Sequence, residues 1–464
     1  MYKENRQMQL KDFVFPYGKL NPENEWAKLA ELLPWERIEE RYAAQFENNG
    51  YPAHPCRMAL GALLIKRRLR CSDEWTVRHV SENPYLQYFT GMKEYGDSCP
   101  FGASTMVAFR KRFSEEDLKI TIPKEDVSDD NDGPPDGGTL IMDATCCPAD
   151  IAYPQDVNLL NEAREKLEGL IDQVCEAQSL PKPRTYREKA RKAYLKISKS
   201  KKRTAKQLRK AVKAQLQYIR RDVGYIVQYV QSGILLTDER MNLMTTLYEQ
   251  QRILYETRTH SIPHRIVSLS QPHIRPIPKG KARAKTEFGA KLHISLVNGY
   301  ARMEQLSFEA YNEADDFFQI VERYRSRYGH YPSRILADRI YRNRETLAFC
   351  KEHGIRLTGP ALGRPPKDKS LSREQQRQEY IDICDLNAVE GAFGTLKTAY
   401  GLGRVAARLE DTCRCAIGIA LLLLNLTKRL RKPLRFVFST SFSCFCCVFH
   451  FTREGCGVDP IWVC

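Results

Sequence analysis

The chain has 464 residues, of which 73 are Lys or Arg and 57 are Asp or Glu, so its formal net charge is +16. Its length allows two or three domains with full-sized cores, and its 42% apolar and 28% charged residues are ordinary for a soluble globular protein. The polar start Met1–Arg6 excludes an export signal there. The basic excess favours nucleic acid or an anionic membrane surface as partner, although many soluble proteins are basic without binding either.

Fifteen cysteines are scattered along the chain. Because their number is odd and no export signal precedes them, we expect reduced thiols in a cytoplasmic protein rather than disulfides. A structural zinc site is not expected, because close pairs such as Cys146-Cys147 lack the CxxC spacing of zinc ligands.

Residues 1–122 have the pattern of a helical region. Met58–Arg70 is predicted to form a helix whose basic last turn suits the helix dipole, and Ser72 is placed to cap the next helix. A further predicted helix carries Arg110 and Arg112. Short stacked helices with exposed basic side chains fit a DNA-binding module, and a helical bundle with solvated charges explains them equally well.

Residues 123–138 are acidic and rich in Gly and Pro, which predicts a flexible linker. A short apolar strand, Thr139–Met142, then ends at Asp143, and the same pattern recurs where Arg334–Ala337 precedes Asp338. An aspartate at the end of a buried strand stands at the rim of the sheet, where it can face a ligand.

Between these two strands, residues at about 157–265 are predicted to form a helical insertion. Its segment 182–221 has dense Lys and Arg and almost no acid, above an apolar helical stripe. A charge run is usually a solvated face, but this one lacks the interspersed acids of such faces. We therefore favour contacts to a phosphate backbone, with Lys201, Lys202 and Arg203 among the contacting residues.

Regular α/β structure returns after the insertion. Lys291–Val297 is a predicted strand, Asn298-Gly299 is a signal for a type I′ hairpin, and 301–308 is the return strand. The elements that follow are helix 314–328, strand 333–338, helix 344–353, strand 355–358, polar loop 363–378, and helices 389–400 and 412–430. This order predicts an α/β fold over 139–430: a ribonuclease-H-like mixed sheet with a helical insertion after its first strand, preceded by an all-α N-terminal domain.

The last residues, 431–464, form an apolar, Cys-rich tail. Its most apolar part, residues 435–451, is barely long enough to span a bilayer and carries several hydroxyl side chains. We expect a packed or loose tail rather than an anchor, and no membrane partner.

Asp143, Asp338 and Glu390 are three acids without a neighbouring histidine, and Glu390 lies in a predicted helix. Carboxylate oxygens without nitrogen or sulfur ligands select Mg²⁺ or Mn²⁺ over zinc. Two such ions roughly 3.5–4 Å apart can clamp the attacking and leaving oxygens of a phosphoryl transfer. The pattern therefore predicts a metal-dependent enzyme of phosphodiester chemistry. Taken singly, each acid is at least as well explained as a cap, the partner of a nearby arginine or a surface charge.

Three other residues lie in or near this pattern. Lys397 follows Glu390 by seven residues, two helical turns on the same face, from which it can reach a phosphate of a bound strand. Tyr400 is close to that face and either stacks on a base or fills the core. His293 is discounted as a ligand, because a lone histidine in a strand is more often structural.

Several stretches of the chain carry specific motifs. They are Val389-Glu390-Gly391-x-Phe393-Gly394-x-x-Lys397-x-x-Tyr400-Gly401-Leu402-x-Arg404, then Ala337-Asp338-x-x-Tyr341-Arg342-Asn343-Arg344-Glu345, then Asp143-Ala144-Thr145, and near the N-terminus Ser72-Asp73-Glu74 and Phe109-Arg110-x-Arg112. As a set they resemble the DDE transposases of bacterial insertion sequences, over about residues 10–430.

The resemblance implies that Asp143, Asp338 and Glu390 are a catalytic triad holding Mg²⁺ or Mn²⁺, with two ions expected. It implies cleavage at the transposon ends, followed by attack of the freed 3′-hydroxyls on target DNA. The amino-terminal helices would recognise the terminal inverted repeats, and a homodimer would bridge both ends, in the bacterial cytoplasm and on the nucleoid when bound. The expected DNA contacts are Lys397, Tyr400, Arg342, Arg404, Arg110, Arg112, Lys201, Lys202 and Arg203.

Two other hypotheses remain open. One is a catalytically inactive or domesticated sequence-specific DNA-binding protein, for instance a repressor of its own element. Another is a nuclease that cuts DNA without joining strands. The basic residues and the amino-terminal helices serve a transposase and a repressor equally, so only the three acids discriminate between them.

Overall fold

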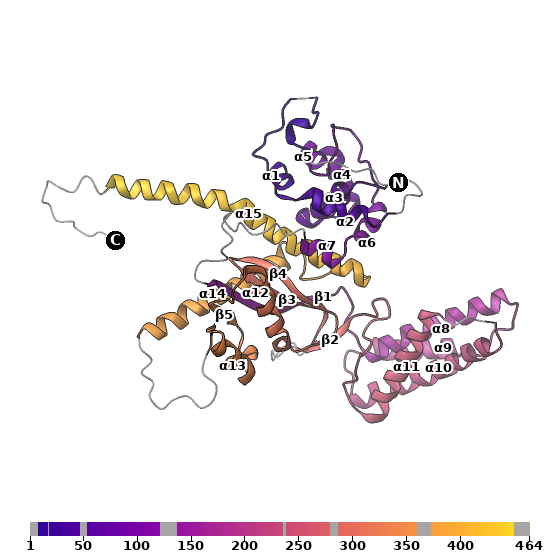
Figure 1. Cartoon of the computed structure of the whole chain (residues 1–464). Coiled ribbons are helices and arrows are strands. Elements are labelled where there is room, and N and C mark those ends of the chain that lie inside the picture. The colour runs from indigo at the N-terminus through magenta and orange to yellow at the C-terminus, as the bar shows by residue number, and fades with distance from the viewer. Residues whose placement is uncertain are drawn as a thin grey trace, which may run out of the picture.

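The computed structural model of the chain describes residues 8–16, 18–46, 53–120, 137–234, 238–278, 286–359 and 373–449. Most of the predicted linker at 123–138 and of the predicted loop at 363–378 lies outside these ranges, as does the tail after residue 449. Figure 1 shows three regions in the described part: an N-terminal helical region, a mixed sheet with its own helices, and a helical bundle that projects from the sheet.

The described N-terminal region consists of short helices. They are α1 (Glu25–Leu32), α2 (Trp35–Ala43), α3 (Cys56–Leu69), α4 (Asp73–Glu82), α5 (Pro84–Phe89), α6 (Thr105–Arg112) and α7 (Glu115–Ile120). As predicted, Ser72 caps α4, and its hydroxyl oxygen accepts the backbone N–H of Trp75 at 3.2 Å. The helix α3 ends in a basic turn, and Arg70 follows it in the left-handed conformation with a φ of 55°.

The strands form one mixed sheet. They are β1 (Thr139–Pro148), β2 (Arg275–Pro278), β3 (Thr286–Val297), β4 (Tyr300–Ser307), β5 (Arg334–Ala337) and β6 (Arg356–Leu357). Their order is β2-β3-β1-β5-β6, and β4 also pairs with β3. The strand β3 is antiparallel to β1, β2 and β4, whereas β5 is parallel to both β1 and β6. Asn298 and Gly299 have φ values of 50° and 74° between β3 and β4, which confirms the predicted type I′ hairpin signal.

The strand that carries Asp143 does not end there, so that prediction was wrong. It continues to Pro148, because Ala144 to Pro148 pair with β3. The parallel pairing of β1 with β5 does end at this point, since its last pair is Met142 with Ala337. Asp143 directly follows Met142, and Asp338 directly follows Ala337. Each aspartate therefore comes immediately after one member of this last parallel pair.

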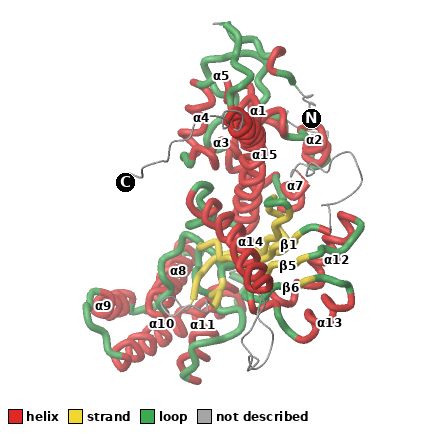
Figure 2. The backbone as a smooth tube through the Cα atoms, turned by 90° about the vertical axis from the view of Figure 1, so that its left-hand side faces the viewer, coloured by secondary structure: helices red, strands yellow, loops and turns green. Residues whose placement is uncertain are grey.

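Helices cover both faces of the sheet. On one face, α12 (Phe317–Tyr328) and α13 (Arg344–Glu352) pack over Leu140 and Met142 of β1. On the other face lie α14 (Arg373–Thr398) and α15 (Glu410–Phe449), whose buried side chains share a core with β3 and β4. That core continues into α3, so the N-terminal helices and the sheet are joined through α15, which runs between them in Figures 1 and 2.

Both of these last helices are longer than predicted. Residues 373–378, expected in a polar loop, are already helical. The helix α15 was expected to end at residue 430, but its backbone remains helical to Phe449. In the ranges that the structure describes, no helix is both long enough and apolar enough to cross a bilayer.

The described residues between β1 and β2 include four inserted helices. They are α8 (Asp156–Ala177), α9 (Arg187–Ser198), α10 (Ala205–Gln231) and α11 (Glu239–Thr257). This bundle has a core of its own, which includes Leu167, Ile171, Ile219 and Leu247.

Candidate active site

Asp143 is a partly buried acid on the face of β1 that α14 covers. Ile141 and Cys147 pack into the core beneath α14, and side chains alternate along a strand, so Asp143 and Thr145 point to that same face. Burial raises the pKa of Asp143 from 3.8 to about 7. A hydrogen bond from the backbone N–H of Ala144, 2.8 Å from Oδ1, works in the opposite direction.

Asp338 and Glu390 approach this carboxyl from two other elements. Asp338 follows β5 and precedes the short 3-10 helix η4 (Arg339–Tyr341), and Glu390 lies on α14 beside the fully buried Val389. Both acids have exposed side chains, and their negative charges raise the pKa of Asp143 further. Within the described ranges, no three His, Cys, Asp or Glu side chains are positioned to hold a metal ion as they stand.

A fourth acid, Glu313, also raises the pKa of Asp143 and was missed from the sequence. Its carboxylate pairs with the ammonium of Lys291 at 2.7 Å and lies 3.4 Å from the hydroxyl of Tyr341. Nothing in its local sequence marks it, because Glu313 belongs to a polar turn before α12. Only the folding of the sheet brings this turn to the end of β5.

His293, discounted as a ligand from the sequence, is fully buried behind the site. Its Nδ1 lies 3.1 Å from Asp316 Oδ2, and its Nε2 lies 3.0 Å from the hydroxyl of Tyr341. Burial lowers the pKa of the ring, so it is neutral at physiological pH. A neutral ring donates from Nδ1 to the carboxylate and accepts from the tyrosine at Nε2.

Lys397 reaches the strand of Asp143 directly. Its ammonium donates to the hydroxyl oxygen of Thr145 at 2.7 Å. Thr145 is two residues beyond Asp143 on the same face, so a cation stands beside the acids.

Three other predicted DNA contacts have structural partners. Tyr400 is buried, with 5% of its surface exposed, and its hydroxyl lies 2.7 Å from that of Thr427, so its ring fills the core. Arg342 donates to the carbonyls of Leu357 and Thr358, both at 2.8 Å, and so ties η4 to the end of β6. The guanidinium of Arg404 is exposed and pairs with the carboxylate of Asp150.

The remaining predicted contacts lie away from the acids. Arg110 makes a bidentate pair with Asp73, and the guanidinium of Arg112 lies over the ring of Phe46. Lys201 and Lys202 are exposed in the turn between α9 and α10. Arg203, in the same turn, donates to the carbonyls of Ser198 and Ser200 and to the side chain of Gln155.

Comparison with known proteins shows that two segments of the chain match protein families. Residues 335–427 match a family described as a transposase DDE domain, and residues 15–112 match one described as a transposase domain. A curated relative, the uncharacterized protein ORF8 in the nfe locus of Rhizobium meliloti, is 32% identical over 152 residues, which are 32% of this chain and 73% of the relative. No solved structure matches the chain. The first matched segment contains Asp338 and Glu390, and the second contains the helices α1 to α6.

Proposed function

The chain belongs to the DDE transposases of insertion sequences, and from this premise we propose that it cleaves the ends of such an element and joins their 3′-hydroxyls to target DNA, with Asp143, Asp338 and Glu390 as its catalytic carboxylates. The observation that carries the assignment is the convergence of charge on Asp143. Asp338 and Glu390 act on it from the end of β5 and from α14, although 52 residues separate them in sequence.

The topology supports a ribonuclease-H-like catalytic core. In the strand order β4-β3-β1-β5-β6, β3 is antiparallel to its neighbours β4 and β1, the last two strands run parallel to β1, and helices cover both faces. The bundle α8–α11 interrupts this core after its first strand. The amino-terminal helices would then recognise the terminal inverted repeats, in the bacterial cytoplasm where the DNA substrate lies.

The donor set fits a hard divalent cation. DDE transposases use divalent metals, and this site offers carboxylate oxygens, which suit Mg²⁺ or Mn²⁺. Asp143 is a partly buried carboxyl, and the nearby acids Asp338, Glu313 and Glu390 raise its pKa further, so a bound cation would stabilise its charged form. Asp143, Asp338 and Glu390 would hold the metal, and the two exposed side chains would turn toward Asp143 to do so. Two bound ions would supply activation of the attacking water or 3′-hydroxyl and stabilisation of the leaving oxygen.

The chain's own residues position the DNA. Lys397, held against Thr145, presents its ammonium beside the acids, where it would bind a non-bridging oxygen of the scissile phosphate. Two active sites are needed to process two ends, so we propose a homodimer when the ends are bound.

The test is Mg²⁺-dependent cleavage of DNA that carries the ends of the element, comparing wild type with Glu390→Gln. Glu379→Gln is the matched control, because Glu379 is exposed on the same helix three turns earlier and far from Asp143. Loss of cleavage in Glu390→Gln alone supports the proposal. End binding without cleavage by the wild type would reject it in favour of a repressor-like protein, and cutting of DNA that lacks the ends would reject it in favour of a plain nuclease.

A further inference from the structure

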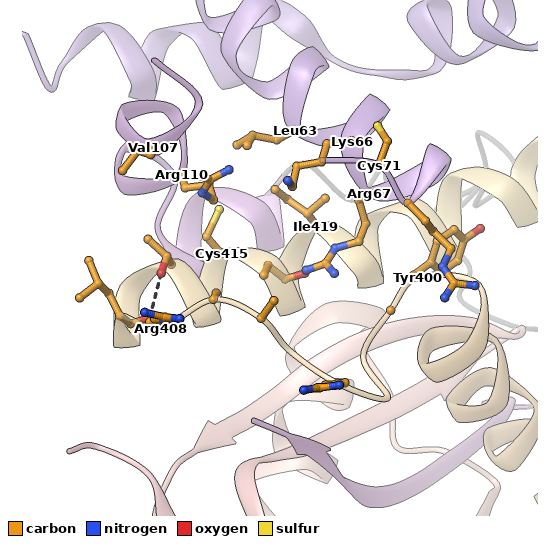
Figure 3. Close-up of a pocket in the computed structure, with 18 residues that line it drawn as sticks. Leu63, Lys66, Arg67, Cys71, Val107, Arg110, Tyr400, Arg408, Cys415 and Ile419 are labelled. Atoms are coloured by element: carbon orange, nitrogen blue, oxygen red, sulfur yellow. Dashed lines mark hydrogen bonds between the residues drawn. The ribbon is translucent and has the colours of Figure 1, made fainter. Parts of the chain in front are cut away.

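A cleft of about 640 Å³ lies between the N-terminal helices and the segment that joins α14 to α15. One wall comes from the end of α3 and from α6, and the other from Tyr400 to Leu409 and the first turns of α15. Figure 3 shows Lys66, Arg67 and Arg110 extending from the first wall toward α15, with Arg408 on the opposite wall. The cleft thus lies between the two segments that match transposase families.

The lining of this cleft is strongly basic. Among the described residues that line it there is no carboxylate, and six side chains are cationic: Lys66, Arg67, Arg70, Arg110, Arg404 and Arg408. Two carboxylates just outside the lining neutralise part of this charge, since Asp73 pairs with Lys66 and Arg110 and Asp150 pairs with Arg404.

Three of the six cations have no ion pair within the described ranges. Arg67 donates to the carbonyl of Ala416 at 3.0 Å and is held in place by it. Arg70 and Arg408 are exposed and face the cleft from opposite walls. The turn after α14 packs closely against Arg67. Gly401 in this turn has a φ of 69°, and a Cβ there would lie 3.2 Å from the Arg67 guanidinium.

We propose that this cleft binds the phosphodiester backbone of DNA at a position separate from the acids. The inference rests on the proposed function for the identity of the DNA, which would run from the amino-terminal helices to β1. The cleft is connected to the site of the acids by short chain segments. Its wall residues Tyr400 and Gly401 follow Lys397, and Asp150, the partner of Arg404, follows β1.

The lining favours a polymer backbone over a free nucleotide. Tyr400, the one aromatic residue in the described part of the lining, is buried and offers no exposed ring on which a base can stack. Arginines on two opposing walls suit phosphates on a strand that passes between them, because guanidinium groups bind phosphate oxygens in a bidentate manner.

The experiment measures binding of a random-sequence duplex by fluorescence anisotropy over a range of salt concentrations, without divalent metal. A phosphate contact contributes about 0.9 to the slope of log K against log salt. Arg70→Ala/Arg408→Ala should therefore lower the slope by about 2 and weaken binding roughly 50-fold at about 0.1 M salt.

The control is Arg258→Ala/Arg240→Ala. Arg258, like Arg70, is an exposed arginine in the left-handed position after a helix, and Arg240 is an exposed arginine on α11. This control should leave slope and affinity unchanged. An equal effect of the two double variants would overturn the proposal. If Arg70→Ala/Arg408→Ala lowers the melting temperature, Arg408→Gln is compared with Arg240→Gln instead, with an expected slope change of about 1 for Arg408→Gln alone.

Two further measurements distinguish a failure of the cleft proposal from a failure of the proposed function. Calorimetric titration with pyrophosphate tests a small ligand, and tight pyrophosphate binding that the double variant loses without any change in the DNA slope would overturn the assignment to DNA. Cleavage of end-bearing DNA is measured in parallel. Cleavage with an unchanged slope would reject the cleft and leave the proposed function, whereas the expected slope change without cleavage would reject the function and leave the cleft.

Discussion

The sheet and the inserted bundle each bury an aspartate whose pKa is raised to about 7, and burial is the main cause in both places. The neighbours of the two carboxyls are opposite in kind. Asp143 is surrounded by further acids, which raise its pKa. Among the charges that act most on the pKa of Asp222 on α10, Glu168 raises it and three arginines lower it: Arg164, Arg221 and Arg187.

This difference separates a binding site from a structural network. The arginines around Asp222 already compensate for part of its buried charge, and no surface of Asp222 is exposed. The acids around Asp143 increase the cost of ionisation, and two of them, Asp338 and Glu390, reach solvent. A cation from solution would stabilise the three ionised carboxylates together. The sign of the neighbouring charges therefore distinguishes the two sites, whereas the pKa alone does not.

Replacement of each buried acid by its amide tests this distinction most strongly. Asp143→Asn removes a proposed metal ligand and should lower the rate of end cleavage by at least about a thousandfold, a loss on the scale of deleting a charge-stabilising group. Asp222→Asn should leave cleavage within about twofold, because Asp222 lies in the bundle. Single-turnover cleavage rates at saturating Mg²⁺ give both numbers. Equal loss in the two variants would show that the two aspartates are not distinguished by their neighbours.

The pH dependence of cleavage should reflect the competition between proton and metal at Asp143. Below about pH 7 this carboxyl carries a proton, which must leave before the group can ligate a cation. At low Mg²⁺ the wild-type rate should fall about tenfold for each pH unit below 7 and level off above it. Raising Mg²⁺ tenfold should move the midpoint about one unit lower, because the metal displaces the proton. A midpoint that does not respond to Mg²⁺ would assign the titration to another group.

The stability of the protein should depend on Asp222 in the same pH range. An acid whose folded pKa exceeds its unfolded value binds a proton more tightly in the native state, so stability is highest below about pH 4 and is lost as pH rises to about 7. Asp222→Asn should remove this loss and stabilise the protein at pH 8, relative to its effect at pH 4, by on the order of 2 kcal/mol. Urea unfolding at the two pH values measures the difference. Glu176→Gln, at an exposed acid on α8, is the control and should show no such difference.

Much of the sheet could be predicted because its signals are local. Asn298-Gly299 marks a hairpin through two residues that tolerate positive φ, and the apolar runs before Asp143 and Asp338 mark two strands that pair in parallel. The helical pattern after Glu390 likewise placed Lys397 on the face that reaches Thr145.

The rest depends on contacts between distant segments. Glu313 has no local signal, because its position beside Asp143 results from the pairing of β3 with β1. Tyr400 occurs in a motif with basic residues, but α15 covers it and buries its ring. The extension of β1 beyond Asp143 similarly requires β3 as a partner. Periodicity within one segment does not contain this information.

The hydrogen bonds of buried polar groups near Asp143 and Asp222 give a finer test of the comparison between the two regions. In the bundle, both carboxylate oxygens of Asp222 are without a hydrogen-bond partner among the described residues. Behind β1, Asp316 and Tyr341 are the hydrogen-bond partners of the two ring nitrogens of the buried His293. Tyr341→Phe leaves Nε2 of His293 without its tyrosine partner and should cost about 1–2 kcal/mol of the free energy of unfolding.

The matched control is Tyr331→Phe, in which an exposed hydroxyl loses its hydrogen bond to Glu322. This control should change the free energy of unfolding by less than about 0.5 kcal/mol. Because Tyr341 lies in η4, directly after Asp338, its replacement should also lower cleavage, but less than Asp143→Asn does. If both phenylalanine variants unfold at the same urea concentration, the buried chain does not stabilise the sheet, and the two acids differ only in the charges that surround them.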